Sequence, residues 1–160
     1  SQKSAAEPHE FRYNPFAADT PEQRHGLSAT KTMTSVGLLM RLYSGSKRDS
    51  QVMRAGADYL KKNLPALGTP REPLRDTYYW YYGTQVMHHY GGSEWEEWNT
   101  QMRDILVQSQ ERGGHAAGSW NPRGDHAGAG GRIYMTALAT CTLEVYYRHL
   151  PLYGWKSVEF

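Results

Sequence analysis

Three segments of the chain share one pattern, in which a turn-rich lead-in is followed by a helix of small and apolar residues that ends on tyrosine. The segments are TMTSVGLLMRLYSG at 32–45, TYYWYYGTQVMHHYGG at 77–92 and IYMTALATCTLEVYYRHLP at 133–151. Tyr43 and Tyr90 are 47 residues apart, a period typical of proteins that repeat one helical unit. The repetition therefore predicts an array of helical units, each of which buries its apolar face against its neighbours.

Two further segments, at 49–65 and 93–110, have the pattern of amphipathic helices, with one apolar face and one polar face. The apolar stripes are Val52, Met53, Ala57 and Leu60 in the earlier segment and Trp95, Trp98, Met102, Ile105 and Leu106 in the later one. Ser93 is followed three residues later by Glu96, which predicts a capping box at the start of the later helix. Both segments are typical of helices on the surface of a domain.

The order along the chain is thus apolar, amphipathic, apolar, amphipathic, apolar. A helix that is apolar on most faces has to be surrounded by protein, whereas a helix with a single apolar stripe can lie outside. We therefore expect an all-α fold of helical hairpins in an inner and an outer layer, with about five main helices and a short sixth near the N-terminus. No segment alternates polar and apolar residues between turn signals, so we expect no substantial sheet.

The apolar segments, together with GSWNP at 118–122, resemble the repeats of the squalene-cyclase and protein-prenyltransferase superfamily, and in particular the C-terminal part of bacterial squalene-cyclase-like repeat proteins. Gln110 and Trp120 are similar to the family's Gln-x-Gly-x-Trp signature, with a longer spacer. The resemblance covers residues 11–153 and implies an α/α toroid of two concentric helical layers. A closed toroid needs about a dozen helices, so this chain corresponds to roughly half of one.

The acidic motif that the resemblance implies for the cyclases is not found in the chain. Those enzymes protonate a polyene with the central aspartic acid of an Asp-x-Asp-Asp motif, which this sequence lacks. Asp76 directly precedes the aromatic helix, so we predict that it is the N-cap of that helix. Asp125 lies in a glycine-rich loop, where aspartate favours a turn. We therefore assign no catalytic residue.

The zinc site that the resemblance implies for the prenyltransferases is not found either, because Cys141 has no Asp-x-Cys pair around it. Cys141 lies among apolar residues, where a free cysteine acts as a small hydrophobic side chain. His88 and His89 are neighbours on a helix and point about 100° apart, which prevents both from binding one metal ion. The glycine-rich loop carries His115, His126 and Asp125 as the remaining candidate ligands. We expect no metal and no other cofactor.

Five consecutive aromatic residues, Tyr78, Tyr79, Trp80, Tyr81 and Tyr82, begin the second apolar segment. They cover every face of the helix, so some of them point towards the concave side of the array. In a cyclase such rings line an apolar pocket and stabilise carbocations, and in a polysaccharide-binding toroid they stack on sugars. The alternative is that the rings only fill the space between the two layers.

Composition limits the partners of the chain. Its 18 basic and 16 acidic side chains give a formal net charge of +2 without a basic run, which disfavours nucleic acid and anionic membranes. The single cysteine excludes an intrachain disulfide. No segment approaches the roughly 18 consecutive apolar residues of a membrane span. We expect a soluble protein with no integral membrane segment, cytoplasmic or exported after removal of a leader.

We expect a tail at 1–10, one helical-repeat domain at 11–153 and a short tail at 154–160. Half a toroid cannot enclose a dry cavity, and its inner helices would expose apolar surface unless a partner covers them. We therefore expect a non-catalytic interaction or structural module, a fragment or subunit of a larger assembly, with a protein partner or a second copy on the inner side, where a small apolar ligand also fits.

The alternative is an enzyme of the same superfamily that acts on a polyprenyl or polysaccharide substrate in an aromatic-lined cavity. Both hypotheses place the ligand or partner surface at the same residues. The predicted surface comprises Asp76, Tyr78, Tyr79, Trp80, Tyr81, Tyr82, His88, Trp120, Asp125 and His126.

Overall fold

The computed structural model of the protein describes residues 9–68, 76–124, 127–150 and 152. Its α-helices are α1 (Lys31–Tyr43), α2 (Gln51–Lys62), α3 (Thr77–Tyr90), α4 (Gly92–Ser109), α5 (Ala127–Leu143) and α6 (Val145–Arg148). Within the described residues the only β-type pairings are isolated bridges, so the predicted all-α class is confirmed. The tails predicted at 1–10 and 154–160 lie outside the described residues, apart from positions 9 and 10.

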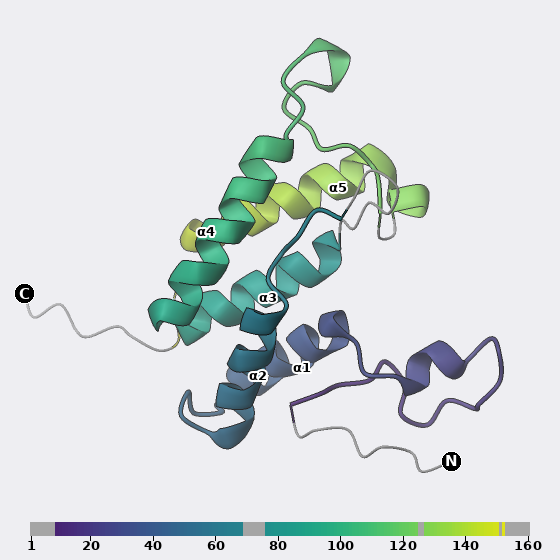
Figure 1. The fold of residues 1–160 in the computed structure, drawn as a ribbon, viewed down its shortest axis with the longest axis vertical. Coiled ribbons are helices and arrows are strands. Elements are labelled where there is room, and N and C mark those ends of the chain that lie inside the picture. Colours follow the sequence, from purple (N-terminus) through teal and green to yellow (C-terminus); the bar gives the residue numbers. More distant parts are fainter. Residues whose placement is uncertain (1–8, 69–75, 125–126, 151, 153–160) are drawn as a thin grey trace, which may run out of the picture.

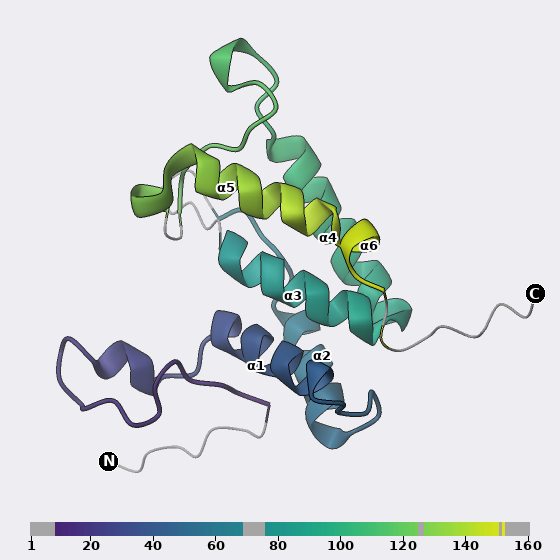
Figure 2. The same cartoon turned by 180° about the vertical axis from the view of Figure 1, so that it is seen from behind.

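The helices form two layers. α3 lies between α1 and α5 and packs closely against both, and α4 and α2 pack on one side of this inner layer. Figure 2 shows α1, α3 and α5 side by side and running in the same direction, and Figure 1 shows α2 and α4 in front of them. α1 with α2, and α3 with α4, are therefore helical hairpins that step back and forth between the layers.

Burial follows the predicted alternation for the central hairpin. Eleven of the fourteen residues of α3 are buried, as expected for a helix surrounded by protein. Only four of the twelve residues of α2 and three of the eighteen residues of α4 are buried, and each set forms a single stripe. The core therefore lies between α3 and the outer layer, with the fully buried Trp98 and Tyr79 at its centre.

Three of the helices begin at side-chain caps that the local sequence supplies. Thr30 accepts a hydrogen bond from the backbone N–H of Met33, and Ser50 accepts one from that of Met53. Asp76 accepts from the backbone N–H of Tyr79 over 3.0 Å, so its predicted role as the N-cap of α3 is confirmed. Each cap satisfies an amide that the first helical turn leaves without a partner.

The predicted capping box at the start of α4 is wrong. α4 begins at Gly92 and has no side-chain cap, and the hydroxyl of Ser93 donates to the neighbouring Glu94. The turn from α3 to α4 consists of Gly91 and Gly92, both at φ near +70°, which is a backbone conformation that favours glycine. The tight glycine turn starts the helix before Ser93 can act as its cap.

α5 is less buried than its sequence pattern predicts. Only Ala127, Met135, Ala139 and Thr142 are buried among its seventeen residues, and Ile133 is 85% exposed. α3 covers one side of α5, and no described element covers the opposite side. α5 is therefore an inner helix at the edge of the layer.

The segment before α1 covers the other edge of the inner layer. It contains a 3₁₀ helix, η1 (Arg24–Leu27), where the sequence predicted a short α-helix; the sixth α-helix is α6 near the C-terminus. The ring of Phe11 lies so close to Gly37 of α1 that a Cβ at Gly37 would be 2.2 Å from Phe11 Cγ. A glycine at this position therefore lets the N-terminal segment pack on α1.

The glycine-rich connection between α4 and α5 projects from one end of the molecule (Figure 1) and contains a second 3₁₀ helix, η2 (Gly114–Ala116). An antiparallel bridge between Gln110 and Trp120 closes its base, and the Gln110 side chain donates to the carbonyl of Gly118 over 3.0 Å. The indole of Trp120 donates to the carbonyl of Leu106 over 2.9 Å. The two signature-like residues therefore act as the structural closure of one loop.

Candidate functional site

The predicted surface residues separate into groups with different environments. Asp76 is engaged at the N-terminus of α3, where Thr32 also donates to its Oδ1 over 3.5 Å. Its carboxylate therefore stabilises the first turn of the helix and joins α1 to α3. Asp125 and His126 lie outside the described residues.

Three of the predicted aromatic residues belong to the core and not to a surface. Tyr79 is fully buried, and its hydroxyl donates to the carbonyl of Asn63 over 2.7 Å. Trp80 is 3% exposed and Trp120 is 4% exposed. These three side chains therefore offer no accessible surface in the single chain.

The remaining tyrosines, Tyr78, Tyr81 and Tyr82, are half-buried on the side of α3 that faces away from α4. Tyr82 packs edge-to-face against Tyr78 at 4.9 Å and against Tyr81 at 5.0 Å between ring centroids. The hydroxyls of Tyr78 and Tyr82 are 3.4 Å apart. We call these three residues the tyrosine cluster.

The hydroxyl of Tyr82 remains protonated at neutral pH. The hydrogen bond from Tyr78, together with burial and the neighbouring tyrosines, raises the pKa of Tyr82 to about 12. A protonated phenol can both donate and accept a hydrogen bond. The cluster therefore offers a polar edge on an aromatic surface, which suits docking and does not supply a general base.

His88 lies at the other end of α3 in a group of rings contributed by three elements. Its Nε2 is 2.8 Å from the carbonyl oxygen of His149, and its ring meets the edge of Trp95 at 5.1 Å. The structure places His88 as a buried link between α3 and the segment after α6, since only 7% of the residue is exposed. His88 therefore offers little accessible surface in the single chain.

His89 and His149 complete this histidine cluster, which we define as His88, His89 and His149. The His89 and His149 rings are 5.7 Å apart, and Nδ1 of His89 accepts from the backbone N–H of Leu152 over 3.3 Å. The hydroxyl of Tyr43, at the end of α1, is 3.5 Å from Nε2 of His89. The sequence analysis did not predict that His89, His149 and Tyr43 lie in contact. The available signal was that tyrosine or histidine occurs at the end of each apolar segment.

The surroundings of His89 and His149 favour the neutral form of both imidazoles by lowering their pKa. Burial is the main cause that lowers the pKa of His89 to about 4, and the nearby His88 and His149 lower it further. Burial also lowers the pKa of His149, with Arg148 as the next cause. A neutral imidazole can ligate a metal. Here, however, the described residues contain no group of three side chains placed to hold a metal ion.

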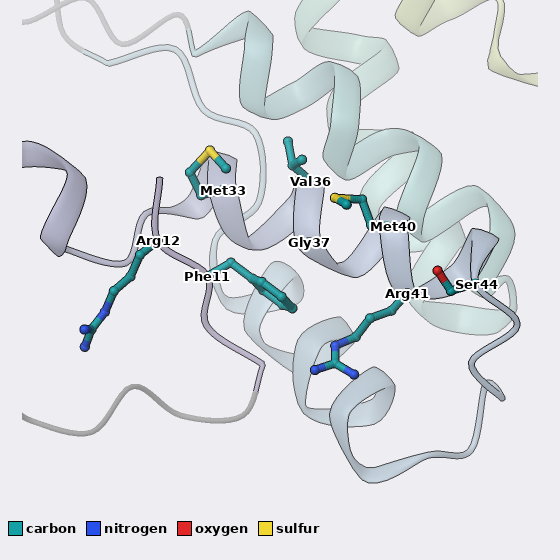
Figure 3. Close-up of a pocket in the computed structure, with 8 residues that line it drawn as sticks. All are labelled: Phe11, Arg12, Met33, Val36, Gly37, Met40, Arg41 and Ser44. Atoms are coloured by element: carbon teal, nitrogen blue, oxygen red, sulfur yellow. The ribbon is translucent and has the colours of Figure 1, made fainter. Parts of the chain in front are cut away.

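A groove of about 340 Å³ lies beside α1. It is lined by Phe11, Arg12, Met33, Val36, Gly37, Met40, Arg41 and Ser44. Figure 3 shows Met33, Val36 and Met40 projecting from one side of α1, while the Arg12 guanidinium points away from them. The guanidinium of Arg41 lies over the Phe11 ring, 5.5 Å from its centroid. The groove is therefore apolar with one cationic edge.

The site has to be interpreted from its own residues, because no family model, curated protein or solved structure matches the chain. Along the described part of the chain, no helix is both long enough and apolar enough to cross a membrane. The carboxylate of Asp76 and the imidazole of His88, two predicted site residues that the structure describes, already bond to the protein's own backbone. The accessible surface of the inner layer includes several large apolar side chains, among them Met40, Ile133 and Tyr147.

Proposed function

We propose that this chain is a non-catalytic helical-repeat module, related to the repeats of the squalene-cyclase and protein-prenyltransferase superfamily, which binds a protein partner along its inner layer. The observation that supports it is the distribution of exposed apolar side chains. On α1, α5, α6 and the residues after α6 these are Met40, Tyr43, Ile133, Tyr146, Tyr147, Leu150 and Leu152. On the described outer helices α2 and α4 the one large exposed apolar side chain is Val107.

Exposed apolar side chains at the ends of the inner layer are unusual for a complete repeat array. Terminal repeats of such arrays normally carry a polar outer face, because bare apolar surface lowers solubility. Contiguous apolar patches on soluble proteins commonly mark interaction sites. Ile133 is 85% exposed and Tyr147 is 91% exposed on the uncovered side of the inner layer, which supports a partner at this place.

The polar residues of the predicted site give little support to the alternative, an enzyme that acts on a polyprenyl or polysaccharide substrate. Acid catalysis needs a carboxylic acid with access to substrate. Asp76 accepts hydrogen bonds from Tyr79 and Thr32, and His88 faces the carbonyl of His149. The tyrosine cluster packs its rings edge-to-face against one another. Asp76 and His88 therefore act as supports of the fold.

The proposal is tested on protein purified from its source, by measuring molar mass in solution. We expect an assembly heavier than one chain. Within it, nitration by tetranitromethane should modify Tyr43 and Tyr147 more slowly than in the isolated chain, whereas Tyr13, which is 70% exposed in the N-terminal segment, should react equally in both. A particle with the mass of one chain, or turnover of a polyprenyl substrate by the isolated chain, would overturn the proposal.

A further inference from the structure

The chain that follows α6 turns back against the C-terminal end of α3 (Figure 2). The structure describes it at His149, Leu150 and Leu152, and we call these three residues the strap. Nε2 of His88 donates to the carbonyl of His149 over 2.8 Å. Nδ1 of His89 accepts from the backbone N–H of Leu152 over 3.3 Å. Two histidines of α3 therefore hold two points of the strap.

Apolar burial anchors α6 but contributes little to the strap. Val145 of α6 is 1% exposed, and the ring of Tyr146 packs against that of Trp95 on α4 with centroids 5.6 Å apart. In the strap, Leu150 is 73% exposed and Leu152 is 49% exposed. Because apolar stabilisation scales with the area removed from water, the strap depends on its polar links to α3 far more than α6 does.

The hydrogen bond to Leu152 requires a neutral imidazole at His89. A backbone N–H can only donate, so Nδ1 is the ring nitrogen that carries no hydrogen. The hydrogen is then on Nε2, which faces the hydroxyl oxygen of Tyr43 at 3.5 Å. A proton added to Nδ1 would place two donors against each other and a positive charge on a residue only 2% exposed. The charged ring and the bond to Leu152 exclude each other.

The link through His88 does not have this sensitivity to acid. An imidazole can donate from Nε2 in its neutral and in its protonated form, so the bond to the carbonyl of His149 is compatible with both. The backbone N–H of His149 also bonds to the carbonyl of Val145 within α6 over 3.1 Å. His149 is therefore fixed from two sides, and the chain beyond it is not.

We propose that protonation of His89 detaches Leu150 and Leu152 from α3, with His149 as the hinge, while α6 stays in place. The inference is independent of the proposed function, because it concerns a contact within one chain. Detachment opens His89 to solvent at the end of the inner layer.

The groups nearest to His89 oppose its protonation while the strap is attached. Burial is the main cause that lowers the pKa of His89 to about 4, followed by His88 on α3 and His149 in the strap. The carbonyl of Leu150 acts in the opposite direction and is the smallest of these causes. Acid therefore favours the detached state, in which the ring is hydrated.

The other titratable groups around the strap bring no negative charge that would stabilise an imidazolium. Tyr43 on α1 keeps its proton, because burial and the neighbouring Tyr81 raise its pKa. Arg148 of α6 is positive and, after burial, is the next cause that lowers the pKa of His149. From α4 the ring of Trp95, which does not titrate, contacts His88.

The size of the effect follows from proton linkage. The ordinary pKa of 6.5 applies to the hydrated ring and the lowered value of about 4 to the attached one. Between pH 6.5 and pH 4.5 the ratio of detached to attached strap should then rise by roughly 40-fold.

The first test measures backbone ¹⁵N order parameters of the wild-type chain by NMR relaxation between pH 6.5 and pH 4.5. Rigid backbone gives values of about 0.85 and flexible backbone values below about 0.6. We expect Leu150 and Leu152 to pass from the rigid to the flexible range, with the midpoint at which the ring resonances of His89 titrate. His149 and Val145 should stay rigid throughout, because their backbone bond lies on the α6 side of the hinge.

The second test compares two matched substitutions. His89→Gln places an amide oxygen that accepts from Leu152 and does not titrate, so the strap should stay attached at pH 4.5. His149→Gln removes the other titrating ring and keeps the backbone carbonyl that His88 bonds, so acid should still detach the strap. The comparison of midpoints in the wild type needs no variant and holds even if a substitution disturbs the fold.

Three results would overturn the inference. One is a wild-type strap whose order parameters stay high down to pH 4.5. Another is a loss of order with a midpoint different from that of His89, or one that spreads at the same pH to α6 and the middle of α3, which indicates general unfolding. The third is acid detachment that His89→Gln retains or that His149→Gln abolishes. None of these results bears on the mass measurement that tests the proposed function.

Discussion

Trp98 of α4 lies directly against Gly83 of α3, and the missing side chain at Gly83 allows the two layers to approach this closely. A Cβ at Gly83 would be 2.7 Å from two ring atoms of Trp98. Trp98 is fully buried, and its Nε1 donates to the hydroxyl of Thr84 over 2.9 Å. The hydrogen bond holds the ring over the glycine, so the ring has little freedom to move aside.

Gly83→Ala should therefore destabilise the protein by about 1–3 kcal/mol, the usual cost of overpacking a core. This loss is expected to exceed the gain of about 0.5–1 kcal/mol that alanine brings to a helix interior. Urea unfolding followed by tryptophan fluorescence measures the change. Gly128→Ala in α5 is the control, because no atom lies within 4 Å of the added Cβ. The stability of this variant should equal or slightly exceed that of the wild type. Equal behaviour of the two variants would contradict the close contact.

The sequence predicted correctly those features of the fold that depend on a few neighbouring residues. Asp76 precedes an apolar helix, and its role as N-cap followed from that position alone. The layer order likewise followed from the number of apolar faces on each helix. Ser93 shows the limit of local reasoning, because its capping box was displaced by the backbone of Gly91 and Gly92.

The sequence could not predict which of the five consecutive aromatic side chains are buried, because their burial depends on residues far away in the sequence. Five consecutive rings cover all sides of α3, so the pattern alone does not say which side the outer layer covers. Trp98 decides this: Tyr79 packs against it with ring centroids 5.6 Å apart and becomes core, while Tyr78 and Tyr81 stay half-buried. The meeting of His89 with His149 likewise depends on the path of the chain after α5.

Asp76→Ala should destabilise the protein by about 0.5–2 kcal/mol, because it removes the N-cap of α3. Asp76→Asn keeps an oxygen acceptor and should lose little stability. Thermal unfolding by circular dichroism compares the two variants. If Asp76 instead acted as an acid catalyst, both variants would lose an activity while stability stayed unchanged.

Tyr79→Phe should destabilise the protein by about 0.5–1.5 kcal/mol, because it removes the hydrogen bond from the buried hydroxyl to the carbonyl of Asn63. Burial raises the pKa of Tyr79 well above its usual range, so this hydroxyl stays protonated as long as the protein is folded. Urea unfolding measures the loss. Tyr147→Phe, at a residue 91% exposed, should leave stability unchanged, and a comparable loss there would argue against this explanation.

Stability should fall as the pH falls from about 6.5 to about 4, because of His89. The pKa of His89 is lowered from 6.5 to about 4 in the folded protein, mainly by burial. Between these values the unfolded chain binds more protons than the folded one, so acid favours unfolding. The groups that face His89 are His88 on α3, Tyr43 on α1, and His149 with the backbone of Leu150 and Leu152 after α6.

His89→Gln tests this dependence, since glutamine does not titrate and can still accept a hydrogen bond from the backbone of Leu152. We expect the variant to lose less stability than the wild type between pH 6.5 and pH 4, measured as the urea midpoint at each pH. His115→Gln is the matched control, because His115 is exposed on the loop before α5 and should leave the wild-type profile unchanged. A profile of His89→Gln that overlays the wild type would show that the acid sensitivity arises from other groups. A shift with His115→Gln as large as that with His89→Gln would assign it to surface charge instead of the buried cluster.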